Sequence, residues 1–213
     1  MTDPLPPDGR GSGGNVGQQV TKLSPDGRIL LQLGTRMVTG DGPDQFSSPS
    51  DVVVGRNGDI FVIDGHGEGT NERVMKFDSD GNFIMQWGSP GNGPCGVHEF
   101  SSLHAIDIDS EGRLFIGDRD NNRIQIYSAD GGYLATLIGD ATELSPWAQM
   151  TVNANIDYIK ARARADLEAE WRFRRPTGLT IDDDYRLVIA EAQHNRAQVY
   201  LKDVGYEDPQ FNL

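Results

Sequence analysis

Three side chains of this sequence have the chemistry of a binding or catalytic site, and each occurs once in a chain that otherwise repeats. They are His66, His104 and Arg119. An imidazole titrates near neutral pH, so it can transfer protons or bind a metal ion. A guanidinium can bind a carboxylate through two parallel hydrogen bonds. A residue present in every copy of a repeat is expected to be structural, whereas a residue present once is a better functional candidate.

His104 lies at the start of a run in which apolar and polar side chains alternate. It stands four residues after a recurring phenylalanine, where the other copies hold Ser50 and Thr177. Alternation with period two is typical of a strand, and this strand would be the innermost of its unit. We therefore consider two roles for His104, as a metal ligand or as a polar side chain that lines the centre of the fold.

Arg119 and His66 lie in turns that follow a recurring acidic residue. Arg119 stands where the other copies hold Gly65 and Ala192, and it would either bind a ligand carboxylate or lie exposed in its loop. His66 belongs to DGHGEGTNE, a turn four residues longer than its counterpart. It would either act as an acid or base or simply be solvated. Both residues are candidate catalytic residues.

The elements that must position these residues are short strands in a repeated unit. Runs of alternating apolar residues are separated by Gly, Asp and Asn clusters, which is the pattern of consecutive antiparallel strands. The units lie at 46–88, 100–139 and 173–202, and 18–34 matches the second half of a unit. Between the last two units, the spacing of apolar residues over about 145–171 predicts one inserted helix.

Four strands in each repeat of about 50 residues predict an all-β fold, a β-propeller whose blades pack around an axis. The chain supplies thirteen predicted strands, about three to three and a half blades, and propellers close with about four to eight blades. Two accounts stay open. The chain is the C-terminal part of a larger or open propeller, or two chains pair as a homodimer to complete a six-bladed ring.

A recurring pair of charged residues is expected to belong to the framework of the blades. An acid ends the second strand of each unit and an arginine opens the third, which predicts an ion pair or a turn-stabilising hydrogen bond. The acids are Asp64, Asp118 and Glu191, and the arginines are Arg73, Arg123 and Arg196. Taken as exposed pairs, they would contribute only about 0–1 kcal/mol each, but their recurrence indicates that they fix the turn.

The composition limits the partners of the protein. The formal net charge is −13, so the surface repels nucleic acid and anionic lipid and favours cationic ligands or metal ions. Close-set carboxylates at Asp107, Asp109 and 182–184 would either bind calcium or be solvated turn residues. Residues 1–17 are expected to be a disordered leader and 203–213 an irregular tail.

The leader also bears on localisation. It has no apolar core of the kind that a signal peptide requires, and no run approaches the length of a membrane span. As written, the chain is therefore expected in the cytoplasm, without a membrane partner. A secreted protein is the alternative if the N-terminus is incomplete.

The repeated unit resembles the NHL repeat, on the segments FSSPSDVVVGRNGDIFVIDG, NERVMKFDSDGNFIMQWG and GRLFIGDRDNNRIQIY. It looks most like bacterial propellers related to peptidyl-α-hydroxyglycine α-amidating lyase, or peptidylamidoglycolate lyase, over about Gln18 to Tyr200. The resemblance implies an NHL-type β-propeller, six-bladed in the family, with a zinc ion held by histidines from several blades. It also implies a reaction that cleaves a C-terminal hydroxyglycine to a peptide amide and glyoxylate.

The resemblance assigns roles to the three candidates. It implies that His104 is a zinc ligand, that Arg119 meets the substrate carboxylate and that His66 takes the place of a pocket tyrosine. The sequence departs from the family at Leu103, where a proline is expected, and it matches one of the zinc-binding histidines. A catalytic zinc needs about three protein ligands.

The primary hypothesis is therefore a binding module that takes a peptide, a protein or a small molecule on its top face. The alternative is a metal-dependent lyase-like enzyme whose missing ligands come from another chain. A degenerate fragment with neither activity is the third hypothesis.

Overall fold

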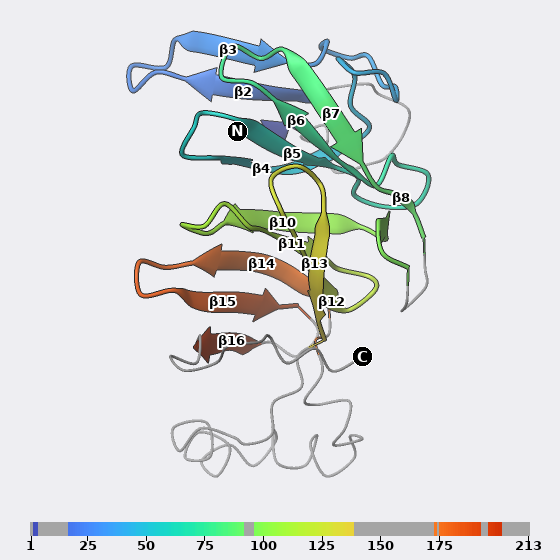
Figure 1. Ribbon diagram of the computed structural model, residues 1–213. Coiled ribbons are helices and arrows are strands. Elements are labelled where there is room, and N and C mark those ends of the chain that lie inside the picture. The colour runs from blue at the N-terminus through green and yellow to red at the C-terminus, as the bar shows by residue number, and fades with distance from the viewer. Residues whose placement is uncertain are drawn as a thin grey trace.

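The computed structural model consists of strands joined by turns. It describes residues 17–91, 96–138, 173, 175–192 and 196–201, together with the backbone of 2–3. Four antiparallel sheets follow one another through the molecule, from β2 and β3 at the top of Figure 1 to β16 below. A fifth sheet is a short parallel pair.

Two of the sheets are complete four-stranded blades in which each strand pairs with the next along the chain. The first holds β4 (Pro49–Val54), β5 (Ile60–Asp64), β6 (Arg73–Phe77) and β7 (Phe83–Trp87). The second holds β10 (Leu103–Ile108), β11 (Leu114–Asp118), β12 (Arg123–Tyr127) and β13 (Tyr133–Leu137). Gly/Asp/Asn turns separate these strands because such residues adopt the backbone conformations that tight turns require.

The remaining sheets are smaller. The first in the chain holds β1 (Thr2–Asp3), β2 (Gln19–Leu23) and β3 (Ile29–Leu33). The last antiparallel sheet holds β14 (Pro176–Ile181), β15 (Arg186–Glu191) and β16 (Arg196–Leu201). The parallel pair, β8 (Ser89–Pro90) with β9 (Glu99–Phe100), joins the two complete blades.

The predicted all-β propeller architecture is confirmed, with β10 packed between β4 and β14. The predicted helix at about 145–171 and the tail at 203–213 lie outside the described residues, as does the predicted leader apart from β1 and Gly17. Within the described residues, no helix has the length and apolar character that a membrane span requires. The two accounts of how the ring is completed stay predictions.

The core lies between consecutive blades rather than within one. Each of three apolar clusters joins the facing sides of two neighbouring sheets. In the cluster between the complete blades, Phe61 and Trp87 of the first pack with Phe100, Leu114 and Tyr127 of the second. A four-stranded sheet has two faces to cover, so each blade depends on its neighbours for burial.

A glycine and a phenylalanine close each of the first two junctions between blades. Gly34 and Gly88 end their outer strands with φ of 79° and 105°, a conformation that favours glycine. Phe46 and Phe100 are fully buried. A Cβ atom on either glycine would lie 2.6 Å from the phenylalanine ring of the next blade. The regular spacing of Gly and Phe in the sequence therefore follows from this close contact.

Candidate functional site

His104 is carried by a β-bulge at the start of β10. The pairing of β10 with β11 shifts between Leu103 and Ala105, so that His104 is the extra residue. The same shift occurs at Ser50 in β4 and at Thr177 in β14. Bulges re-aim side chains and are common next to active sites. The repeated backbone thus presents one side chain per blade at the same end of the inner strands, and only in the second complete blade is that side chain a histidine.

The three predicted candidates come together where the two complete blades meet. The rings of His66, which follows β5, and His104 lie edge to face, with centroids 5.0 Å apart and planes at 63°. Arg119, which follows β11, places Nη1 at 3.5 Å from His66 Nε2. The same nitrogen donates to the Ser102 hydroxyl at 3.4 Å. Residues that are far apart in the sequence therefore form one cluster, which we call the His–Arg cluster (His66, His104 and Arg119).

Two buried polar atoms of the His–Arg cluster have no hydrogen-bond partner among the described residues. They are His104 Nδ1 and Arg119 Nε. Buried polar groups in proteins are almost always paired with protein or water, so each of these two atoms needs a water molecule or a ligand as its partner. All three side chains are only partly buried, which leaves them open to a ligand.

The electrostatics of the cluster favour neutral imidazoles. Burial lowers the pKa of His66 below its usual 6.5, and the nearby His104 and Arg119 lower it further. Burial also lowers the pKa of His104, with Arg119 acting in the same direction and a backbone hydrogen bond with Thr177 opposing it. At neutral pH the cluster therefore holds one cation, the guanidinium, and two uncharged rings that can donate or accept a hydrogen bond.

The spacing of the two histidine rings matches that of a zinc-bound pair, but the described residues do not make up a zinc site. Two imidazoles on one zinc, with Zn–N bonds of about 2.0–2.1 Å and a tetrahedral angle, have ring centroids roughly 5 Å apart. The rings of His66 and His104 are at this distance. Among the described residues, however, no group of three or more His, Cys, Asp or Glu side chains is arranged to hold a metal ion. The zinc prediction for His104 stays a prediction.

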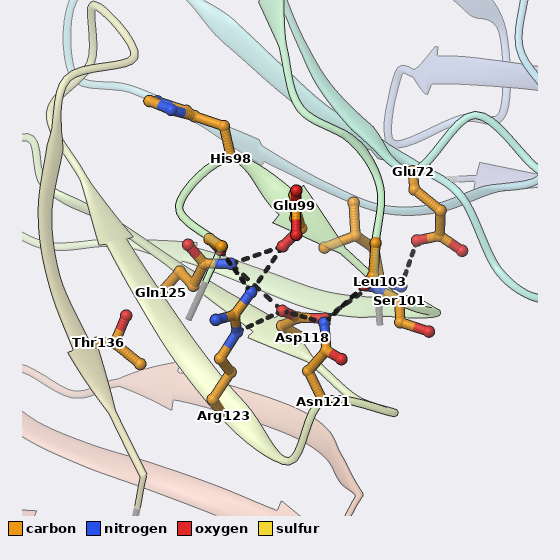
Figure 2. A network of polar contacts seen from close by, with 12 residues as sticks. Glu72, His98, Glu99, Ser101, Leu103, Asp118, Asn121, Arg123, Gln125 and Thr136 are labelled. Atoms are coloured by element: carbon orange, nitrogen blue, oxygen red, sulfur yellow. Dashed lines mark hydrogen bonds and ion pairs between the residues drawn. The ribbon is translucent and has the colours of Figure 1, made fainter. Parts of the chain in front are cut away.

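Two of the three recurring pairs of acid and arginine form buried ion pairs, and the side chain of Arg196 in the third lies outside the described residues. Arg123 Nε donates to Asp118 at 2.7 Å, and Asp118 also accepts from the Ser101 amide and from Asn121, as Figure 2 shows. Asp64 and Arg73 repeat this arrangement in the first complete blade, at 3.1 Å. The predicted ion pair is confirmed in both blades.

The expectation that such pairs are exposed is wrong. Side-chain exposure is 0% for each of the two acids and 3% for each of the two arginines. The pairs are buried because the arginines also reach into the loop that precedes each blade: Arg73 donates to Gln45 O and Arg123 to Glu99 O. They therefore join the loop to the sheet, which a turn-stabilising pair at the surface would not do.

The carboxylates considered for calcium are engaged with the protein. Asp107 accepts hydrogen bonds from the amide of Ile181 and the hydroxyl of Thr180 in the next blade. Asp109 pairs with Arg113. In a third turn, Asp182 pairs with Arg186. These contacts give each of the three acids a structural role, and calcium binding stays a prediction without a supporting contact.

Sequence reasoning missed a set of side chains that tie one blade to the next. Gln18, Glu72 and Asn122 each occupy the position directly before the third strand of a blade, and each accepts a backbone amide of the following blade. The residue at this position differs between the copies, but its side chain always has an acceptor oxygen. This recurring oxygen was the available signal for the contact.

Comparison with known proteins places the repeated unit among propellers. A family model described as a 6-bladed beta-propeller matches residues 46–158, which is more than half of the chain. NHL repeat-containing protein 3 of Homo sapiens is 37% identical over 123 residues, covering 56% of this chain and 34% of that protein.

A second relative carries the name of an enzyme. Probable peptidyl-alpha-hydroxyglycine alpha-amidating lyase pgal-1 of Caenorhabditis elegans is 37% identical over 105 residues, covering 48% of this chain and 28% of that protein. Among solved structures, virginiamycin B lyase from Staphylococcus aureus aligns with a TM-score of 0.48 and 14% identity, over 88% of this chain and 50% of that one. The chain spans about a third or less of the length of the two curated relatives.

Proposed function

This chain belongs to the DUF5128 family of 6-bladed beta-propellers, and we propose that it binds a carboxylate-bearing ligand at the His–Arg cluster. The observation that carries the proposal is the state of Arg119. Its guanidinium is partly buried, its Nε has no hydrogen-bond partner, and no carboxylate pairs with it within the part of the chain that the structure describes. A ligand carboxylate would supply both the acceptor and the countercharge.

The geometry of a guanidinium fits this ligand class. The Nε and a terminal nitrogen of an arginine point in parallel, so a carboxylate can bind both at once. The uncharged imidazoles of His66 and His104 beside Arg119 add donors without adding a second charge. The C-terminus of a peptide and a small carboxylic acid both satisfy this chemistry.

The proposal is tested by calorimetric titration with N-acetylglycine and with its uncharged amide. We expect the acid to bind and the amide to bind at least about tenfold more weakly, because hydrogen bonds to charged groups contribute about 1.5–3 kcal/mol. Arg119→Gln should abolish this preference. Arg28→Gln, which changes an exposed arginine, is the matched control. Equal affinity of wild type and Arg119→Gln for the acid would overturn the proposal.

A lyase-like enzyme is the second candidate. It is favoured by the paired rings of His66 and His104 and by the similarity to the C. elegans protein, whose name gives it a lyase activity. In this candidate the two histidines would hold a zinc ion that supplies a Lewis acid, and Arg119 would orient the substrate through its carboxylate. The remaining ligands would come from blades beyond the described residues or from a second chain.

The two candidates differ in metal content and in product. Elemental analysis of the purified protein should find stoichiometric zinc only if the second candidate is correct, and His104→Ala should then lose it. A peptide ending in hydroxyglycine should release glyoxylate under the same condition. Zinc-free protein that binds N-acetylglycine without forming glyoxylate from the peptide would support the binding module and exclude the lyase.

A further inference from the structure

Glu72 reaches from the first complete blade to the strand that carries His104. Its side chain is buried, with 4% exposure. One carboxylate oxygen accepts the Ser102 amide at 2.9 Å, and the other accepts the Leu103 amide at 3.1 Å. Thr70 donates a further bond from its hydroxyl. Figure 2 shows the carboxylate directed at the backbone beside Leu103.

This contact is one copy of a device found at three junctions between blades. Gln18 accepts the amide of Ser48 at 2.7 Å, and Asn122 accepts the amide of Arg175 at 2.9 Å. The acceptor residue and the first donor residue at each junction have positive φ. The values for Gln18, Ser48, Glu72, Ser102, Asn122 and Arg175 are 64°, 77°, 50°, 59°, 54° and 53°. Side-chain-bearing residues hold such a conformation only where surrounding contacts enforce it, so the device fixes the start of each inner strand.

The junction at Glu72 differs from the junctions at Gln18 and Asn122 in the charge of the acceptor and in the residues whose amides it binds. Gln18 and Asn122 are neutral amides, whereas Glu72 is a carboxylate that engages two successive amides. Hydrogen bonds to an ionised acceptor are about twice as strong as neutral ones. The residues it holds lead directly into the His–Arg cluster, because Leu103 precedes the bulge at His104 and the Ser102 hydroxyl accepts from Arg119.

We infer that Glu72 is a positioning residue of the site: by holding the amides of Ser102 and Leu103, it sets the placement of Arg119 and His104. The inference rests on the proposed function in so far as the cluster binds a ligand. The placement itself can be measured without any ligand. Loss of Glu72 should release the backbone at Ser102 and so withdraw the hydroxyl that Arg119 contacts.

The test compares Glu72→Ala, Glu72→Gln and the matched variant Gln18→Ala in the full chain. The first readout is the imidazole NMR spectrum without ligand. Glu72→Ala should move the resonances of His66 and His104 and leave those of His98, which packs on Tyr127 away from the cluster. Glu72→Gln keeps an acceptor oxygen and should restore most of the wild-type positions. Gln18→Ala should leave His66 and His104 close to wild type.

The second readout is the affinity for N-acetylglycine. Removing a residue that orients a site typically costs about tenfold or more, so Glu72→Ala should weaken binding by about that factor while Gln18→Ala leaves it unchanged. If Glu72→Ala and Gln18→Ala have the same effect on both readouts, Glu72 is only a structural tie and the inference is wrong.

The two proposals fail in distinguishable ways. Unchanged His66 and His104 resonances in Glu72→Ala overturn the positioning role whatever binds. Shifted resonances in a protein whose wild type does not bind N-acetylglycine support the positioning role and overturn the proposed ligand class. If Glu72→Ala does not fold, Glu72→Gln carries the test. It keeps an acceptor for only one of the two amides, so the His66 and His104 resonances should move slightly more than in Gln18→Ala. Shifts no larger than those of Gln18→Ala would overturn the inference.

Discussion

The imidazoles of His66 and His104 meet edge to face at 5.0 Å, although one follows the second strand of its blade and the other opens the first strand of the next. Both residues lie at irregular points of the backbone. His66 belongs to the longer turn after β5, and His104 is the extra residue of the bulge in β10. Burial lowers the pKa of both rings, and Arg119 acts in the same direction, so this junction between blades places two uncharged imidazoles beside one guanidinium.

The lowered pKa values of the two histidines predict how stability depends on pH. Because the unfolded chain binds these protons more readily than the folded one, the stability they confer is complete above about pH 6.5 and falls as the pH drops toward the folded values. His104→Gln removes one such group. Its free energy of unfolding, measured in urea at about pH 7.5 and about pH 5.5, should therefore fall less on acidification than that of wild type.

The double variant His66→Gln, His104→Gln provides the internal check on this pH dependence. It should flatten the dependence further than either single change. A loss of stability on acidification as steep as that of wild type would show that the rings do not titrate in the way that their burial predicts.

The buried ion pair of Asp118 with Arg123 should be far more important for stability than a surface pair. Asp118→Ala leaves the Arg123 guanidinium buried without its carboxylate, which costs about 3–5 kcal/mol. Asp26→Ala removes an exposed partner of Arg28 and should have a much smaller effect on stability. Urea unfolding of both variants measures the difference. Similar losses in the two would contradict the framework role of Asp118.

The glycine at the end of an outer strand is predicted to be irreplaceable for steric reasons. Gly88 and Gly112 both have positive φ, 105° and 80°, so either change to alanine should cost about 1–2 kcal/mol in backbone strain. A Cβ at Gly88 would also lie 2.6 Å from the Phe100 ring, whereas one at Gly112 meets nothing within 4 Å. Overpacking adds about 1–3 kcal/mol, so Gly88→Ala should have the lower melting temperature. Equal melting temperatures would show that the junction can relax around the methyl group.

Much of the fold could be predicted because the repeat carries its own internal comparison. The period-two pattern gave the strands, and the matched positions of Phe46 and Phe100 gave the boundaries of the blades. The acids at the ends of β5 and β11 were assigned to the framework because they recur. Their burial was not predictable, because the partners of Arg73 and Arg123 lie in loops whose path no periodicity encodes.

The candidate site was predicted in part. His66, His104 and Arg119 were singled out because they break the repeat, and the structure brings all three together. Glu72 was missed for the opposite reason, because it follows the repeat. The equivalent residues also carry an acceptor oxygen, and Glu72 differs from them only in its charge. The contact also depends on positive φ at Glu72 and Ser102. Glutamate and serine rarely adopt this conformation, so the sequence did not predict it.

The most direct test of the central claim is to locate where a carboxylate binds. The chain has four histidines, so imidazole NMR spectra recorded during addition of N-acetylglycine can distinguish the cluster from other surfaces. The account predicts that the resonances of His66 and His104 move together and saturate, that those of His98 stay in place, and that Arg119→Gln abolishes the shifts. Saturating shifts at His98 alone, or shifts at His66 and His104 that persist in Arg119→Gln, would contradict it.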